Sequence, residues 1–452
     1  MAMAMEQPRW VKMICAGAVG SAQHRRSGDL SKSCVAGCEV HLSPQIVAAP
    51  GGLFRVTSLR GLIRLPLFQC SVLILLTLWL RIASASAPYF VDAARHISAI
   101  ETGKLVIHTP GYFLFNLSGF ILSHLLHVSA GKALHVLNVA FSVAGVAVFY
   151  LLVSRLLASR LLPAVSPFWL SLAYTCSPIV WFSADVHSSY AAMTFFAPLL
   201  ILVLEVDQRF VWACVVWALM TGFRPSDGVF VLPWMLFHAL RYPWKQRLAG
   251  VLAAIAIVAA WWVPTAQRYG GSLLLPLSSS RQQVHGLAQG ILTGHLGVHA
   301  AVNALHTVAG IIMTWGLLTP AVYLGAIAWK RSDIARSMTI FLVPGLAFFL
   351  LYYFSDGPYL AYIAAAGLVL AGVHLASRPL ATQRTIYAVA ISASVLFMIF
   401  ARPANGKPSK LRAVTDAYFV RYSVPSLKEQ RDPRLAKLLG ACHDQSVAGV
   451  CR

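Results

Sequence analysis

Long apolar segments separated by short polar loops fill the chain between Leu65 and Ala401. Most of these segments are about 17 to 25 residues long, the length that an α-helix needs to cross a hydrocarbon core of about 30 Å. Because backbone polar groups in lipid must be satisfied internally, continuous apolar segments of this kind are helical. The expected segments are residues 65–82, 111–127, 131–154, 164–183, 186–204, 210–222, 227–240, 248–266, 301–328, 337–354, 359–376 and 385–401.

The composition agrees with this pattern. Hydrophobic residues make up 58% of the 452 residues and charged residues only 11%, less than half of the roughly 25% that is typical of soluble domains. We therefore expect an all-α, polytopic membrane protein with about 11 to 12 apolar segments, in which residues 61–401 form the transmembrane domain. Residues 1–60 are expected to be a disordered basic extension or the product of a start assigned too far upstream, and residues 402–452 a short polar, basic tail.

The formal net charge of +21 indicates membrane topology rather than nucleic-acid binding, because the basic residues lie in short loops between apolar segments. If every segment crossed, Arg155, Arg160 and Lys330 would fall outside. If residues 111–127 are re-entrant or interfacial, all later basic loops become cytoplasmic; an additional crossing near residue 111 is an alternative. A re-entrant or interfacial segment at residues 111–127 places these residues on the outer side: Asp92, Glu101, His108, Asp185, Asp227, residues 267–300 and Asp356.

Carboxylates are rare between Leu65 and Ala401, and each is costly within a membrane. Asp92, Arg95 and His96 are spaced to share one face of a helix. Asp92 is suited to accept a proton from a substrate hydroxyl; the alternative is an ion pair that anchors the loop. The eight carboxylates are Asp92, Glu101, Asp185, Glu205, Asp207, Asp227, Asp333 and Asp356.

The same loop continues with His108, Thr109, Pro110, Gly111 and Tyr112. An acidic residue followed by a His-Pro-Gly type turn after the first span resembles the GT-C superfamily of membrane glycosyltransferases, especially its protein O-mannosyltransferase-like branch. Two later turns extend the resemblance, and the three features together cover about residues 65 to 401. These turns are Trp181-Phe-Ser-Ala-Asp185-Val-His187-Ser-Ser-Tyr190 and Phe354-Ser-Asp356-Gly-Pro358-Tyr359.

The resemblance implies transfer of a hexose or mannose-like sugar from a polyprenyl-phosphate donor to a protein, lipid or glycan acceptor on the outer face of the inner or plasma membrane. It implies an inverting single displacement with Asp92 as general base, and we group His96 and Glu101 with it. Thr109 stands where the branch has proline, and Asp185 and His187 often correspond to Glu and Tyr, which leaves sugar and acceptor open. The substrate-binding candidates are His108, Pro110, Gly111, Tyr112, Asp185, His187, Arg224, Asp227, Arg281 and Tyr359.

Two arginines on the expected outer side are candidates for binding the donor phosphate. Arg224 is either a phosphate clamp or the partner of Asp227 in a salt bridge, and Arg281 is the second candidate. Tyr112 and Tyr359 suit either sugar contacts or an interfacial aromatic belt. No cofactor is assigned, and a divalent cation stays open although the loop histidines match no ligand spacing. A transporter or lipid flippase is the alternative function.

Overall fold

The computed structural model describes residues 66–84, 91–107, 111–162, 164–274, 291–294, 297–352 and 357–401. Within these residues every regular element is a helix, as the apolar pattern predicts. Several predictions concern residues outside the described ranges: the extension 1–60, the tail 402–452, His108, Pro110, Arg281 and Asp356.

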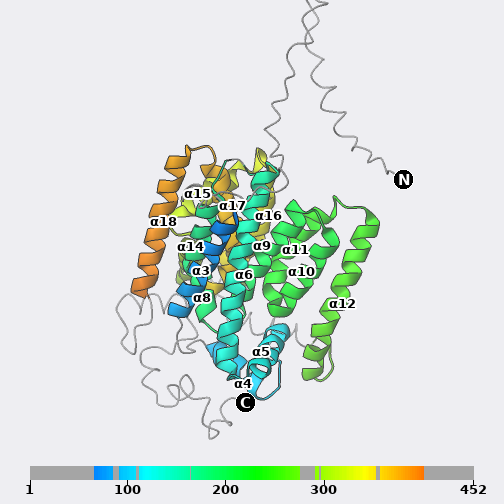
Figure 1. Ribbon diagram of the computed structural model, residues 1–452. Helices are drawn as coiled ribbons and strands as arrows, with labels where there is room; N and C mark the ends of the chain where they lie inside the picture. Colours follow the sequence, from blue (N-terminus) through cyan, green and yellow to red (C-terminus); the bar gives the residue numbers. More distant parts are fainter. Residues whose placement is uncertain are drawn as a thin grey trace, which may run out of the picture. The chain divides into compact units, whose positions relative to one another are not determined.

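The first span, α3 (Pro66–Ala83), leads to two short helices, α4 (Val91–Glu101) and α5 (Phe113–Leu126). They lie at one end of the bundle, where the long helix α6 (Ala130–Ala158) begins (Figure 1). The 14 residues of α5 rise about 21 Å, less than the roughly 30 Å of a hydrocarbon core. Helices α10 and α11 are about as short, so whether residues 111–127 complete a crossing stays a prediction.

The segment predicted at residues 164–183 is broken into α7 (Pro167–Cys176) and α8 (Pro178–Asp185). Proline at the start of each helix explains the break, because Pro178 cannot donate the hydrogen bond that would continue α7 and is well placed in a first turn. A short turn then leads to α9 (Tyr190–Ile201), which continues through a π-helical turn, η1 (Leu202–Val206).

The next helices, α10 (Phe210–Phe223) and α11 (Pro225–Ala239), are joined at Arg224, and α12 (Trp244–Arg268) follows. The chain then forms α14 (Val298–Trp315) and α15 (Thr319–Ile327), joined by η3 (Gly316–Leu318). The remaining elements are η2 (Ile291–Thr293), η4 (Ala328–Lys330), α16 (Asp333–Leu351), η5 (Gly357–Ile363), α17 (Ala364–Leu375) and α18 (Leu380–Ala401).

Helix α17 lies in the centre of the bundle, whereas α3, α12 and α18 lie at its edge. The apolar window of residues 357–375 is 83% buried, against 17% for α3 and 22% for both α12 and α18. Helix α15 packs closely against α17, and this explains the glycine at position 325 of α15. A Cβ at Gly325 would lie 2.0 Å from the carbonyl oxygen of Leu370 in α17.

Seven of the described helices are long and apolar enough to cross a membrane. Their outward side chains are apolar too: Leu75 of α3 is 64% exposed and Leu252 of α12 is 57% exposed. In water such a perimeter would be a large unprotected apolar surface, whereas in lipid it is the expected one. The chain is therefore an integral, multi-pass membrane protein.

Candidate functional site

Arg224 is a buried cation at the junction of α10 and α11, where its side chain is only 1% exposed. Its Nε donates to Asp227 Oδ1 over 3.1 Å, and the Asp227 side chain is fully buried as well. Pro225 starts α11 and places Asp227 in the first turn, where the partial positive charge of a helix N-terminus favours a carboxylate. The salt bridge considered from the sequence is thus present in the structure.

Three tyrosine rings surround the Arg224 guanidinium. Its Cζ lies 4.0 Å from the ring centroid of Tyr190, 4.4 Å from that of Tyr359 and 5.7 Å from that of Tyr112. Cations near aromatic faces are attracted by the ring quadrupole, by about 2 kcal/mol or more when both are desolvated. We call this group, with Ser189 and Asp227, the Arg224 cluster: Tyr112, Ser189, Tyr190, Arg224, Asp227 and Tyr359.

The Arg224 cluster holds buried polar atoms that have no hydrogen-bond partner among the described residues. Nη1 of Arg224 donates to Ser189 Oγ over 3.3 Å, but Nη2 and the Asp227 Oδ2 atom have no such partner. The Tyr362 hydroxyl, which interacts electrostatically with Asp227, is in the same condition. Buried polar atoms of this kind normally bind water or a ligand.

Asp92 lies in the first turn of α4 and pairs with Arg95, whose Nη1 is 3.3 Å from Asp92 Oδ1. The Arg95 side chain is 51% exposed and that of Asp92 is 21% exposed, so this is a surface pair of the kind that contributes about 0 to 1 kcal/mol. Glu101 follows nine residues later, a helix rise of about 13 Å and half a turn out of phase. Asp92 and Glu101 therefore lie on different faces of α4.

His96 connects α4 to the Arg224 cluster. Its ring is fully buried and lies edge-on to the Tyr112 ring at 5.6 Å. Its Nδ1 is 2.6 Å from Asn116 Oδ1, and the Asn116 amide donates to the Leu105 carbonyl. Because Asn116 uses its Nδ2 for Leu105, its Oδ1 is the acceptor and His96 Nδ1 carries a proton. His96 therefore helps to fix the position of Tyr112.

Gly111 and Tyr112 form the strained entry to α5. Gly111 has a φ of 108°, and a Cβ at this position would meet Thr265 Cγ2 at 2.8 Å. Tyr112 has a φ of 53°, a left-handed conformation that is uncommon for a residue with a side chain. Backbone strain of this kind is held in place by surrounding contacts and is frequent at functional sites. Here the strained backbone is that of Tyr112, whose ring lies near Arg224.

Asp185 and His187 lie beside the Arg224 cluster without belonging to it. Asp185 accepts a hydrogen bond from Ser84 over 3.1 Å. His187 has a left-handed backbone, with a φ of 51°, and its ring stacks on His135 at 5.5 Å. Burial, with a smaller effect of His135, lowers the pKa of His187 to about 4, so this side chain is neutral at neutral pH. The turn that they form leads directly to Ser189 in the Arg224 cluster.

Arg81 is a buried cation that is not among the residues predicted from the sequence. It is fully buried and donates to Ser142 Oγ over 3.1 Å and to the Thr175 carbonyl over 2.8 Å. It also interacts electrostatically with Asp185 and lies 5.2 Å from the centre of the Trp181 ring. A charged residue inside the first apolar segment was the available signal, because such residues seldom occur there without a specific reason.

Among the described residues, no three His, Cys, Asp or Glu side chains come together as a metal site would require. His285 and His295, two of the loop histidines considered from the sequence, lie outside the described residues.

No protein-family model matches the chain, and no curated protein sequence does. A structural match is found with ArnT from Cupriavidus metallidurans, solved bound to undecaprenyl phosphate: the TM-score is 0.56 at 12% identity, covering 80% of this chain and 69% of that one. The Archaeoglobus fulgidus oligosaccharyltransferase tethered with an acceptor peptide has a TM-score of 0.42 at 10% identity. The apo form of the same enzyme has a TM-score of 0.41 at 11% identity. This chain spans about three fifths of the length of that enzyme, 59% in the first structure and 60% in the second.

The match to ArnT shows that the two chains share a fold. This confirms the fold that the resemblance in the first outer loop and the later turns implied. At 12% identity the match specifies neither a substrate nor a branch of the superfamily.

Proposed function

We propose that this chain is a membrane glycosyltransferase that moves a sugar from a polyprenyl-phosphate donor to an acceptor on the outer face of the membrane. The Arg224 cluster is the observation that carries the proposal. A phosphate leaving group develops negative charge as the bond to the sugar breaks, and a preorganised cation in a site of low polarity stabilises that charge. Arg224 Nη2 and the Tyr362 hydroxyl are polar atoms suited to this role.

The position of these charges in the bundle supports transfer over transport. A transporter usually binds its substrate near the middle of the membrane, at interrupted helices. Arg224 instead lies at a helix junction, in contact with Tyr112 at the start of α5 and Tyr359 in η5. Helix α5 lies at one end of the bundle (Figure 1), and in this proposal the phosphate of the lipid carrier binds at that end.

In this proposal Asp92 is the general base that accepts the proton of the acceptor hydroxyl. Helix α4 lies at the same end of the bundle as α5 (Figure 1), and the contact between His96 and Tyr112 joins it to the Arg224 cluster. An inverting displacement needs the base and the leaving phosphate on opposite sides of the reacting carbon. In the proposed site the base acts from α4 and the phosphate lies at Arg224, so the two roles belong to separate elements.

The proposal also covers the branch of the GT-C superfamily, the sugar, the acceptor and the carrier. The His-Thr-Pro-Gly-Tyr loop supports an O-mannosyltransferase-like enzyme and therefore a hexose or mannose-like sugar. The acceptor is a protein, lipid or glycan hydroxyl. ArnT was solved with undecaprenyl phosphate, which makes this prenyl chain the first carrier to supply.

The test is carrier release by membranes that contain the full chain, supplied with undecaprenyl-phosphate hexoses and a lysate as the source of acceptor. Released undecaprenyl phosphate reports turnover whatever the acceptor is. We expect turnover of at least one hexose donor that is lost in Arg224→Lys and unchanged in Arg378→Gln, a substitution in a loop outside the cluster. Equal turnover in Arg224→Lys would remove Arg224 from the phosphate site, and no turnover with any hexose would contradict the proposed reaction.

A further inference from the structure

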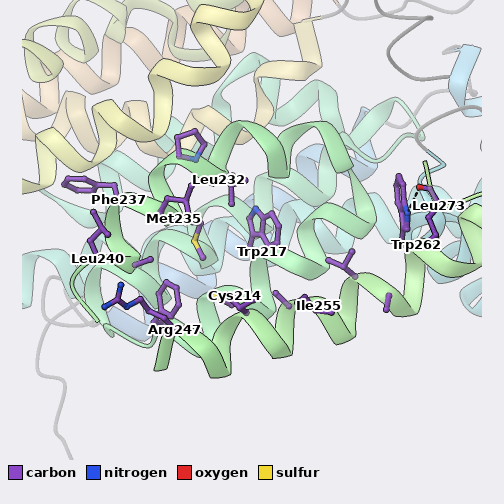
Figure 2. Close-up of a pocket in the computed structure, with 18 of the residues that line it drawn as sticks. Cys214, Trp217, Leu232, Met235, Phe237, Leu240, Arg247, Ile255, Trp262 and Leu273 are labelled. Atoms are coloured by element: carbon purple, nitrogen blue, oxygen red, sulfur yellow. Dashed lines mark hydrogen bonds between the residues drawn. The ribbon is translucent and has the colours of Figure 1, made fainter. Parts of the chain in front are cut away.

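A long apolar groove runs between α10, α11 and α12. It has a volume of about 980 Å³, at the upper end of the range for small-molecule sites. Figure 2 shows Arg247 at one end of the groove and Trp262 with Leu273 at the other. Among the described lining residues Arg247 is the charged one, and the rest are mainly aliphatic and aromatic, including Cys214, Trp217, Leu236 and Ile255.

The charged end of the groove lies away from the Arg224 cluster. On α11 its lining begins at Leu232, eight residues and roughly 12 Å of helix rise beyond Arg224. On α10 the lining residues lie between Phe210 and Trp217, in the half of that helix that precedes the junction. An anion that occupies the Arg247 end of the groove is therefore distinct from one bound at Arg224.

Two arginines lie at the charged end, and the neighbouring residue His238 of α11 belongs to an acid–base pair. Arg247 lies in the first turn of α12 and has a buried Nε atom without a hydrogen-bond partner among the described residues. Arg241 lies over the ring of Phe237, a lining residue, with 4.7 Å between Cζ and the ring centroid. On the inner side of α11, His238 is 3.4 Å from Glu205. The exposed Arg241 and the partly buried Arg247 leave this end of the groove positively charged.

The outer wall of the groove faces lipid. The apolar window of α12 is only 22% buried, and the lining residues Val251 and Ile255 are 48% and 59% exposed. From Arg247 to Val263 the helix rises about 24 Å, more than one leaflet of a hydrocarbon core of about 30 Å. An acyl chain therefore fits along the groove with its head group at the level of Arg247.

We propose that this groove binds one anionic phospholipid, with its phosphate at Arg247 and an acyl chain along α10 and α12. Three observations carry the proposal: the apolar lining, the cation at one end, and the unpartnered Nε atom at the boundary where a phosphate diester would lie. The ligand is separate from the donor and acceptor of the proposed reaction.

The test is native mass spectrometry of the full chain with equal amounts of phosphatidylglycerol and phosphatidylcholine that carry identical acyl chains. We expect about tenfold preferred retention of phosphatidylglycerol, the size expected of one charge-assisted contact. Arg247→Gln should abolish the preference and Arg247→Lys should keep part of it. Arg384→Gln is the matched control, because Arg384 is an exposed arginine near the start of α18, and it should keep the full preference.

A second variant tests the apolar part of the groove. Val251→Trp places a large ring in the groove from an exposed position, so we expect lower retention of both lipids without loss of the folded protein. Equal retention of the two lipids by the wild type, or equal effects of Arg247→Gln and Arg384→Gln, would overturn the proposal. Retention of undecaprenyl phosphate in place of phosphatidylglycerol, lost in Val251→Trp, would also overturn it and assign the groove to the carrier.

Discussion

The Arg224 guanidinium lies over the Tyr190 ring, with 4.0 Å between Cζ and the ring centroid, while its Nε donates to Asp227. The two charges neutralise each other in a place where both side chains are buried. Removal of one partner leaves the other buried and unpaired, which is typically worth 3 to 5 kcal/mol, whereas replacement of both by neutral groups is often tolerated.

This relationship separates the structural and functional roles of Arg224. We expect Arg224→Gln to lower the free energy of unfolding by about 3 to 5 kcal/mol because Asp227 is left buried without its partner. The double variant Arg224→Gln, Asp227→Asn should recover most of that loss. Thermal unfolding in detergent measures the change in stability, and carrier release measures the change in turnover. Recovery of both stability and turnover in the double variant would show that the cation has no role beyond pairing with Asp227.

Gly111 provides a second test because it combines a positive φ with a close neighbour. We expect Gly111→Ala to cost more stability than Gly103→Ala, since Gly103 also has a positive φ but no atom within 4 Å of a Cβ. Strain of this kind is worth about 1 to 3 kcal/mol. Thermal unfolding of both variants gives the difference. The double variant Gly111→Ala, Thr265→Ser removes the methyl group in the contact and should recover part of the loss; equal losses at Gly111 and Gly103 would contradict this explanation.

His187 predicts a dependence of stability on pH. Its pKa of about 4 in the folded chain is below the ordinary value of about 6.5, so the unfolded chain binds the proton first as the pH falls. The stability associated with neutral His187 is therefore present above about pH 6.5 and is lost between about pH 6.5 and 4. Unfolding temperatures measured across this window should fall less steeply in His187→Asn, because asparagine does not bind a proton in this range. Asparagine is the suitable replacement because it accepts the left-handed backbone. Identical slopes would show that His187 does not contribute.

The apolar pattern predicts most of the helices because each crossing needs a long apolar segment, and α3, α6, α9 and α16 begin and end near the expected residues. The break at Pro178 was missed, since a proline within an apolar segment can bend a helix as well as end it. Helix period alone would have separated Asp92 from Glu101.

Part of the candidate site was accessible from the sequence. Arg224 was conspicuous as a charge in a turn where the positive-inside rule does not place one. The approach of Tyr112, Tyr190 and Tyr359 to it depends on how distant helices pack, and an interfacial belt explains the same tyrosines equally well. Arg81 was missed because one arginine near the end of a span can extend to the membrane surface; its burial is a property of the assembled bundle.

Carrier release by Asp92→Asn compared with Arg95→Gln tests the central claim most directly, because both substitutions break the same surface ion pair. If Asp92 is the general base, Asp92→Asn lowers the rate of undecaprenyl phosphate release by about 10² to 10⁴. Arg95→Gln then stays within about fivefold of the wild type, since an exposed pair contributes no more than about 1 kcal/mol. Equal, small effects of the two substitutions at equal expression would contradict the account and leave Asp92 as an anchor of its loop.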